Sequence, residues 1–232
     1  MLAIYPCRPG DVNEELRYSL RSLANMPDIT EVCIVGYCPS WCNPDLFIPG
    51  NRCDTGHANV YDNIRIASQH PDVADNICVM NDDFFVTEPV ETVETFYRCA
   101  LADHLDIPRV KRGSWWKDSL VTTQTCLQAH GIAAPLSYEL HVPLPVEKAA
   151  MAETLQLFQH VTPANPPQWR SLYGNMHNIG GQQRDDVKAY QAGKLNQPYH
   201  STEPRSFPAY RDQLAAMFPA PSRYELDTEL AA

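Results

Sequence analysis

The stretch Ile77-Cys78-Val79-Met80-Asn81-Asp82-Asp83-Phe84-Phe85-Val86 decides how this chain is interpreted. Its apolar half is typical of a buried strand, and two adjacent carboxylates follow that strand. Neighbouring carboxylates repel each other, and burying either one without a partner is costly. A cation between them removes that cost, and Mg²⁺ or Mn²⁺ commonly links carboxylates to substrate phosphates. The stretch therefore predicts that Asp82 and Asp83 bind Mg²⁺ or Mn²⁺ together with a diphosphate substrate.

An ordinary turn is the alternative interpretation of the same residues. Asn and Asp side chains hydrogen-bond to nearby backbone groups and end strands, so Asn81-Asp82-Asp83 also fits a simple strand-to-turn transition. Other segments of the chain have to decide between the metal site and the turn.

Length and composition are those of an ordinary globular protein. The chain has 232 residues, 44% of them hydrophobic and 20% charged, which is enough for one sizeable core. We expect one domain over residues 1–232, in which 162–232 is a loop-rich C-terminal extension because Pro, Gly, Asn and Gln increase there. No apolar run approaches the roughly 20 residues of a membrane span, and the start lacks a secretory signal, so we expect a cytoplasmic protein.

The formal net charge of −10 argues against nucleic acid as the main partner, because that binding depends on clustered Lys and Arg. A local basic cluster surrounds Trp115 and Trp116. It either contacts an anionic substrate or forms a solvated loop, and the loop is the more common case. The cluster consists of Arg109, Lys111, Arg112 and Lys117.

Zinc is not favoured by the cysteines. Cys38, Cys42 and Cys53 are close in sequence, but they lack the second ligand pair of a structural zinc site. Several other cysteines fall in apolar periodic segments, where Cys behaves as a small buried hydrophobe.

The order of the predicted elements indicates an α/β fold. Short β-branched runs at 2–6, 31–37 and 76–80 predict strands, and the segments between them have helical spacing. Strands separated by helices form a mostly parallel sheet flanked by helices, and ligands bind beyond the carboxyl ends of such strands. Asp82 and Asp83 stand at that position.

Five helices are predicted. In the first, Asp11-x-x-Glu14 resembles a capping box, and Leu16, Leu20 and Leu23 form the buried stripe. Without further information, Arg17 and Arg21 on its other faces are interpreted as solvated. The other helices are expected at 57–69, 90–104, 115–130 and 147–159, with a strand and an extended Pro-bounded segment over 137–145.

Four segments, taken in order, resemble conserved blocks of the Stealth family. The first, Asn13-Glu-Glu-Leu-Arg-Tyr-Ser-Leu-Arg-Ser-Leu23, is followed by Pro39-Ser-Trp41. Asn81-Asp-Asp-Phe-Phe85, Tyr138-Glu-Leu-His-Val-Pro143 and the weaker Trp169-Arg-Ser-Leu-Tyr-Gly-Asn175 are similar to later blocks. Members of that family are sugar-1-phosphate transferases, including capsule polymerases. They have a nucleotide-diphospho-sugar transferase (GT-A-like) fold and use a nucleotide-sugar donor and a divalent metal.

The resemblance implies a role for each candidate residue. Asp82 and Asp83 would bind the metal, and His141 would deprotonate a hydroxyl acceptor such as a glycan or another polymer, with Glu15 as the competing base. Donor phosphates would be bound by arginines, whose forked guanidinium matches phosphate oxygens. The expected substrate-binding residues are Arg17, Arg21, Asn63 and Arg170.

The chain also departs from this family. Its Trp-Val-Asp-Gly block is replaced by Ile4-Tyr-Pro-Cys-Arg-Pro-Gly10, so donor recognition is expected to differ. Ser206-Phe207 and Phe218-Pro-Ala-Pro-Ser222 are similar to the ends of small bacteriophage proteins described as glycosyltransferases. Transfer of a sugar or of a sugar phosphate is therefore left open. A non-catalytic sugar- or nucleotide-binding module and a metal-dependent phosphohydrolase are the alternatives.

Overall fold

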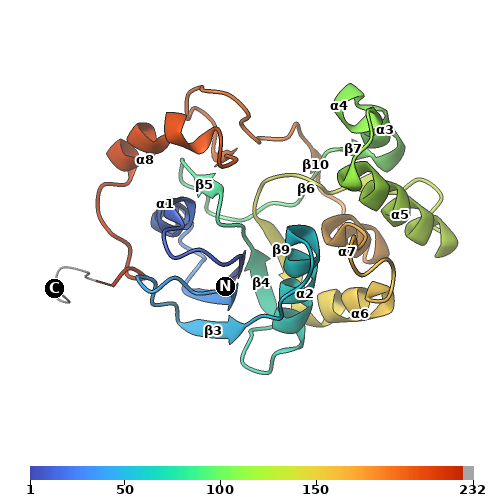
Figure 1. Ribbon diagram of the computed structural model, residues 1–232, viewed down its shortest axis with the longest axis horizontal. Helices are drawn as coiled ribbons and strands as arrows, with labels where there is room; N and C mark the ends of the chain where they lie inside the picture. Colours follow the sequence, from blue (N-terminus) through green and yellow to red (C-terminus); the bar gives the residue numbers. More distant parts are fainter. Residues whose placement is uncertain (227–232) are drawn as a thin grey trace.

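Five strands form the central sheet in the order β3-β2-β1-β4-β9. The computed structural model describes residues 1–226 (Figure 1). Neighbouring strands are parallel except β9, which pairs antiparallel with β4. The strands are β1 (Leu2–Cys7), β2 (Glu31–Gly36), β3 (Leu46–Pro49), β4 (Asn76–Val79) and β9 (Leu144–Glu147). The expected mixed α/β fold with a mostly parallel sheet is confirmed.

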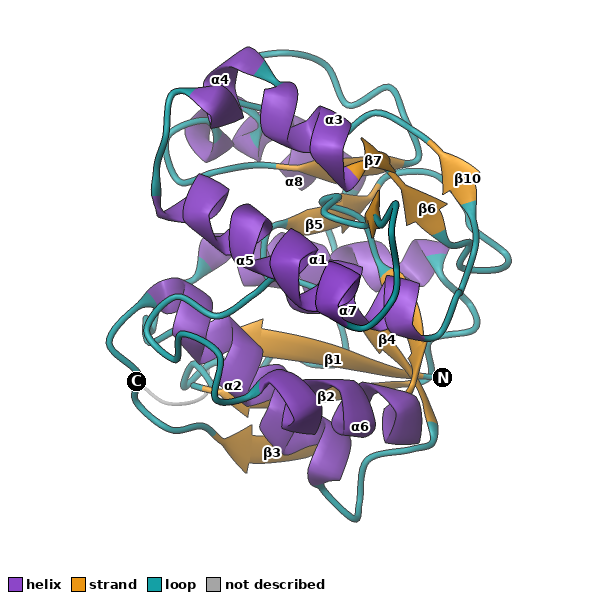
Figure 2. Ribbon diagram, turned by 90° about the vertical axis from the view of Figure 1, so that its right-hand side faces the viewer, coloured by secondary structure: helices purple, strands orange, loops and turns teal. Residues whose placement is uncertain are grey.

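Helices cover both faces of this sheet. Along β1 the side chains alternate, so Leu2 and Ile4 join one core cluster while Ala3 and Tyr5 join the other. The first face is covered by α2 (Gly56–Gln69) and α6 (Lys148–Phe158), which Figure 2 shows side by side in front of the strands. The opposite face is covered by α1 (Glu14–Ser22). Its Leu16 and Leu20 are buried as the spacing predicts, and so is Leu23 in the 3₁₀ turn that follows.

Most of the remaining helices lie above β1, β2 and β3 in Figure 2. Figure 1 shows α3, α4 and α5 on one side of this region and α8 near α1 on the other. A third core cluster joins Tyr18 of α1 to Leu214 of α8. The helices are α3 (Leu101–Asp106), α4 (Pro108–Lys111), α5 (Trp115–Ala129), α7 (Trp169–Met176) and α8 (Arg211–Met217), with 3₁₀ turns at Leu23–Asn25 and Phe207–Ala209.

Short strand pairs connect these parts. Antiparallel pairing joins β5 (Phe84–Val86) to β11 (Tyr199–Ser201) and β7 (Cys99–Ala100) to β8 (Leu136–Ser137). The β6 strand (Phe96–Tyr97) pairs in parallel with β10 (Gln182–Gln183). The β5–β11 pair brings residues near 200 next to Asp83.

The structure corrects several predicted elements. The helix expected over 90–104 is wrong, because residues 90–100 are loop apart from the short strands β6 and β7, and only α3 is helical at the end of the segment. Aromatic residues in this segment favour strand pairing. The α1 cap is Asn13 rather than Asp11, since the Asn13 side chain accepts from the Leu16 N–H at 3.3 Å. The sequence analysis missed β3 and interpreted β9 only as an extended segment. Both carry a proline, which an edge strand tolerates.

Within residues 1–226 there is no helix with the length and apolar character needed to cross a membrane.

Candidate active site

Asp82 and Asp83 follow β4 at the carboxyl edge of the sheet. The turn is held in place by Ser19 of α1, whose hydroxyl donates to the main-chain oxygen of Phe84 at 2.5 Å. Both carboxylates line a cavity of about 370 Å³, which we call the Asp82 cavity. Its wall includes Arg8, Glu15, Asn63, Asn81, His141 and Lys188. The structure therefore places the acidic pair in a crevice together with several of the other candidate residues.

A lysine neutralises Asp83. Lys188 forms an ion pair with Asp83 Oδ2, and the Ser201 hydroxyl donates to the same oxygen at 3.1 Å. Both charged side chains are largely buried, with 12% of Lys188 and 14% of Asp83 exposed. The sequence analysis assigned this compensating charge to a metal ion, but charge balance at Asp83 does not require one.

Asp82 is held less completely. Its Oδ2 accepts from the Asn13 side-chain amide at 3.0 Å. Burial, followed by repulsion from Asp83, raises the pKa of Asp82, although Asn13, Arg8 and Lys188 act in the opposite direction. A cation close to Asp82 would favour its ionised form. Asn13 thus caps α1 and also positions an acidic side chain of the cavity.

Glu15 lies in the same cavity but is only 7% exposed. The Thr202 hydroxyl donates to Glu15 Oε1 at 2.6 Å. Burial raises the pKa of Glu15, and the nearby Asp83 and Asp82 raise it further. The three carboxylates therefore form one negatively charged group, of which Glu15 is the most enclosed.

The oxygen atoms of this group fit a hard divalent ion. Asn81 Oδ1 is buried and has no hydrogen-bond partner among residues 1–226, and Asn81 lines the cavity beside the two aspartates. Two carboxylates and an amide oxygen are ligands that Mg²⁺ and Mn²⁺ accept. No group of three or more His, Cys, Asp or Glu in the described part of the chain is arranged to bind a metal. Mg²⁺ commonly binds through only one or two protein carboxylates, so the oxygen atoms of Asp82, Asp83 and Asn81 are chemically compatible with such an ion.

Asn63 is fixed by two close glycines. Its amide donates to the Val35 carbonyl at 3.3 Å, and its Oδ1 has no partner among the described residues. A Cβ on Gly36 would stand 2.4 Å from the Cys7 carbonyl and 2.5 Å from Asn63 Nδ2, and a Cβ on Gly50 would stand 2.2 Å from Asn63 Oδ1. Glycine at both positions therefore lets Asn63 approach the sheet and face the Asp82 cavity.

His141 is oriented by Asp186. Its Nδ1 lies 3.0 Å from both carboxylate oxygens, and its backbone N–H donates to Oδ1 at 3.0 Å. Burial alone would raise the pKa of Asp186, but hydrogen bonds and electrostatic attraction from His141, with Arg98 at 3.3 Å, hold that pKa well below its usual range. An Asp at Nδ1 leaves Nε2 available to exchange a proton in the cavity.

Arg170 lies deeper. It is 4% exposed, its Nη1 donates to the Val142 carbonyl at 2.9 Å, and its Nη2 has no partner among residues 1–226. Burial lowers the pKa of Arg170, while Glu139 and other acidic groups act against that shift. Arg170 lines a smaller cavity of about 250 Å³, the Arg170 cavity, which also contains Asn81 and His141. The free N–H of a buried guanidinium there is suited to an anionic or carbonyl oxygen.

Arg17 and Arg21 require a correction. Both bind Glu225 at 2.7 Å, and Arg17 also stacks 4.1 Å above the Trp41 ring. Neither lines the Asp82 cavity. Their expected role as phosphate ligands is replaced by a structural one, because together they attach the C-terminal segment to α1.

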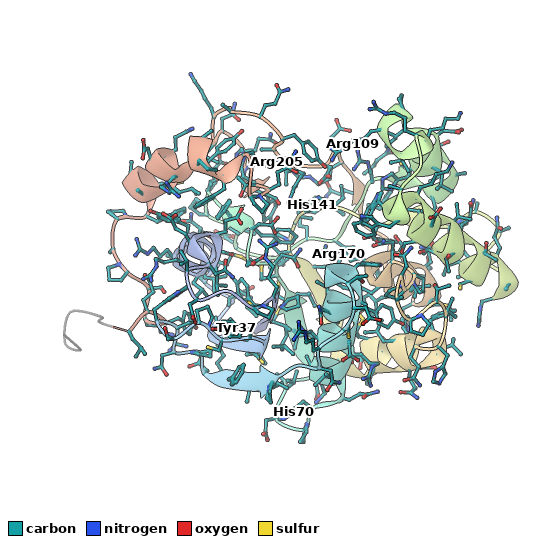
Figure 3. All side chains as sticks on the ribbon, in the orientation of Figure 1. Tyr37, His70, Arg109, His141, Arg170 and Arg205 are labelled. Carbon is teal, nitrogen blue, oxygen red and sulfur yellow. The ribbon has the colours of Figure 1, made fainter. Side chains whose placement is uncertain are left out.

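Three cavities meet at His141 and Trp115. Besides the two cavities already described, one of about 700 Å³ lies between α4–α5 and residues 186–203, and we call it the Tyr190 cavity. Trp115 and His141 line all three. Figure 3 shows His141 and Arg170 near the middle of the view, with Arg109 further toward α4. The expected loop around Arg109 is partly helical, and Arg109 stacks 3.8 Å from the Tyr190 ring centre.

Sequence reasoning missed Lys188, Asp186 and Arg98. Lys188 is 105 residues from Asp83, and Asp186 is 45 residues from His141. No local pattern marks them. The only signal was Gly180-Gly181, interpreted as a turn or hinge, which indicates a change of chain direction before them.

No protein-family model matches the chain, and no curated protein compared with it matches either.

Proposed function

We propose that this protein is a transferase that moves a sugar or a sugar 1-phosphate from a nucleotide-sugar donor to a hydroxyl acceptor, with Mg²⁺ or Mn²⁺ bound. The observation that carries the proposal is the meeting of two groups in one cavity. An Asp-oriented histidine, His141, faces the same space as the carboxylates Asp82 and Asp83. A base beside a site for a metal and phosphates is what transfer to a hydroxyl requires.

Asp82, Asp83 and Asn81 would hold the metal through oxygen atoms. When bound, it would neutralise charge on the donor diphosphate and on the departing nucleotide. Lys188 and Arg8 line the same cavity, and Arg170 lies in the adjoining one, so cationic groups surround the space where phosphates would lie. Such fixed charges stabilise a transition state without reorganising.

The proton is assigned to His141. The acceptor O–H bond breaks as its proton passes to Nε2, and Asp186 stabilises the imidazolium that forms. The acceptor oxygen then bonds either to the anomeric carbon or to the phosphorus that carries the sugar. In the first case the electron pair leaves with a nucleoside diphosphate, and in the second with a nucleoside monophosphate. Glu15 is the competing base. Because its Oε1 already accepts a hydrogen bond from Thr202, only Oε2 could take the proton.

The spatial arrangement of the four Stealth-like segments supports the proposal. Asn13 of the first contacts Asp82 of the second, and His141 of the third lines the same cavity. Arg170 of the fourth lines the adjoining cavity with His141. Segments far apart in sequence thus gather at one site. On this basis we also propose the nucleotide-diphospho-sugar transferase type of fold for the mixed sheet.

The test is incubation with a panel of nucleotide sugars and divalent ions, followed by mass spectrometry. We expect metal-dependent release of nucleotide that EDTA abolishes, and the product separates glycosyl transfer (diphosphate) from phosphodiester formation (monophosphate). Asp83→Ala should remove Mn²⁺-supported donor binding in calorimetry. Asp185→Asn, an exposed neighbour of Asp186, is the control for nonspecific effects. Donor binding without turnover for every sugar and metal would refute the transferase.

One observation favours a second candidate, a non-catalytic nucleotide- or sugar-binding module. Lys188 already neutralises Asp83, so the cavity can bind an anion without metal. That module binds donor equally well with and without EDTA and releases no product. A phosphohydrolase differs from both, because it releases phosphate without attaching a sugar to an acceptor.

A further inference from the structure

The Tyr190 cavity is the largest of the three that meet at His141. Its volume is about 700 Å³, within the usual range for small-ligand sites. Asp82 and Asp83 line the Asp82 cavity but not this one. His141 and Lys188 line both this cavity and the Asp82 cavity. A molecule in the Tyr190 cavity can therefore reach the proposed base without displacing a ligand held by the acidic pair.

The charges that line this cavity cancel. Arg98 pairs with Asp186 at 3.3 Å, and Lys188 pairs with Asp83. The remaining lining charges are three acidic or basic side chains: Arg109, Glu203 and Glu139. Glu139 accepts hydrogen bonds from Ser171 at 2.9 and 3.0 Å and is attracted to Arg170, so it is already balanced.

Once these pairs are set aside, one positive charge, on Arg109, and one negative charge, on Glu203, line the cavity. Neither side chain forms a salt bridge within residues 1–226. Together they offer hydrogen-bond donors and an acceptor without a net charge. An anionic ligand would gain from Arg109 but be repelled by Glu203. A neutral ligand with several hydroxyl groups can bond to both.

Aromatic faces supply the rest of the surface. Tyr190 is 45% exposed and Trp115 is 56% exposed, so both side chains offer ring surface to a ligand. Trp115 packs edge-to-face with Trp116 at 5.7 Å, so the two rings form one rigid wall. The faces of a pyranose ring carry C–H groups and are apolar, whereas its edge carries hydroxyls. Flat aromatic surfaces combined with hydrogen-bonding groups of balanced charge suit such a ring.

We propose that the Tyr190 cavity is the acceptor site and that it takes an uncharged pyranose, stacked on the aromatic side chains with one hydroxyl directed to Nε2 of His141. This inference rests on the proposed transferase function and adds the location and charge class of its acceptor. Arg109 and Glu203 bind hydroxyls at the ring edge. Because Arg109 stacks on one face of the Tyr190 ring, the pyranose contacts the opposite face of that ring.

The test compares Tyr190→Ala with Phe47→Ala. Tyr190 lines only this cavity of the three, and Phe47 of β3 is an equally exposed aromatic, at 47%, that lines none of them. The probes are neutral trisaccharides (maltotriose, mannotriose and chitotriose) and trigalacturonic acid as the anionic counterpart. Binding is followed by tryptophan fluorescence, and donor turnover is measured separately as nucleotide release without acceptor.

We expect at least one neutral trisaccharide to bind, Tyr190→Ala to weaken that binding at least fivefold, and Phe47→Ala to leave it unchanged. Nucleotide release without acceptor should be the same in Phe47→Ala as in the unaltered protein. Binding of trigalacturonic acid alone, neutral binding that Tyr190→Ala does not affect, or no neutral binding would each overturn the acceptor assignment. Failure of the proposed transferase function gives a different result from failure of the acceptor assignment. In that case a trisaccharide would still bind, but no donor would release nucleotide.

Discussion

Replacing Asp186 by Asn tests the proposed chemistry most directly. The carboxylate accepts from the backbone N–H and Nδ1 of His141 at 3.0 Å and from Arg98 at 3.3 Å. An Asn side chain keeps one oxygen but turns an N–H₂ group toward one of these donors. If the amide N–H₂ group faces Nδ1 of His141, the imidazole carries its own proton on Nε2. Nε2 can then no longer take the proton of the substrate hydroxyl.

The expected loss in turnover is the contribution of general-base assistance, about 10²–10⁴-fold. A tenfold change corresponds to about 1.4 kcal/mol of activation free energy, so the loss is about 3–5 kcal/mol. The KM for the donor should change little, because Asp186 does not line the Asp82 cavity. The assay is nucleotide release in the presence of acceptor, measured from pH 5 to 9. Asp185→Asn serves as the matched control, being adjacent and exposed.

Stability provides the independent readout. Hydrogen bonds to a charged group contribute about 1.5–3 kcal/mol, so Asp186→Asn should unfold at lower urea concentration at pH 7. The folded-state pKa of Asp186 is lowered, hence its contribution is complete above the unfolded value of about 3.9 and is lost as the pH falls through the folded value. The two proteins should therefore become equally stable only in strong acid. A folded variant with wild-type turnover would refute the role of Asp186 in orienting the base.

Three further predictions concern charge and backbone. Lys188→Met should tighten Mn²⁺ binding roughly tenfold in calorimetry, because the Lys188 ammonium no longer competes with the metal ion for Asp83. Weaker Mn²⁺ binding in the variant would contradict competition between the lysine and the metal. Glu225→Gln should lower the free energy of unfolding by about 2 kcal/mol at neutral pH, since its carboxylate binds Arg17 and Arg21. Burial alone would raise the pKa of Glu225, but the bonds from Arg21, Ser222 and Arg17 lower it. The loss of stability in Glu225→Gln, measured from the urea midpoint, should therefore shrink below about pH 4, where Glu225 of the unfolded chain becomes protonated. An unchanged loss at that pH would argue against the ion pairs. Gly36→Ala should lower the free energy of unfolding in urea by at least about 2 kcal/mol. The control is Gly113→Ala, because Gly113 also has a positive φ but a Cβ there would meet nothing within 4 Å, and its loss should be smaller. Equal losses would mean that the clash with Cys7 and Asn63 is unimportant.

The sequence predicted the parts of the fold that depend on local periodicity. The runs containing Ile4, Ile34 and Ile77 are β-branched and became β1, β2 and β4. Periodic leucines predicted a helix at α1, and Leu16 and Leu20 form its buried side. The segment 90–104 failed because its strands are two residues long and depend on partners such as Gln182 and Ser137, which lie far away in sequence.

The candidate site was predicted only where a residue type carries its own chemistry. Asp82 stood out as a carboxylate beside a strand, whereas His141 and Arg170 were expected in the site because of the Stealth-like segments that contain them. The structure brings all three to adjoining cavities. Arg17 carried the same signal and was assigned the wrong place, because its partner Glu225 is 208 residues away. A helical arginine facing a phosphate and one facing a carboxylate have the same local sequence.

The C-terminal part of the chain contributes side chains to the candidate site. Residues 162–232 were expected to be a loop-rich extension, and long loops do connect α7 and α8 there. Yet this part supplies Arg170, Asp186 and Lys188. Each is largely buried, and they lie beside the charged groups Glu139, Arg98 and Asp83 of the first 141 residues, in that order. A carboxylate pair left without Lys188, or a histidine without Asp186, would be costly to bury and poorly oriented. The sheet and the C-terminal segment must therefore fold together for the cavity to hold its charges, and the segment is part of the site.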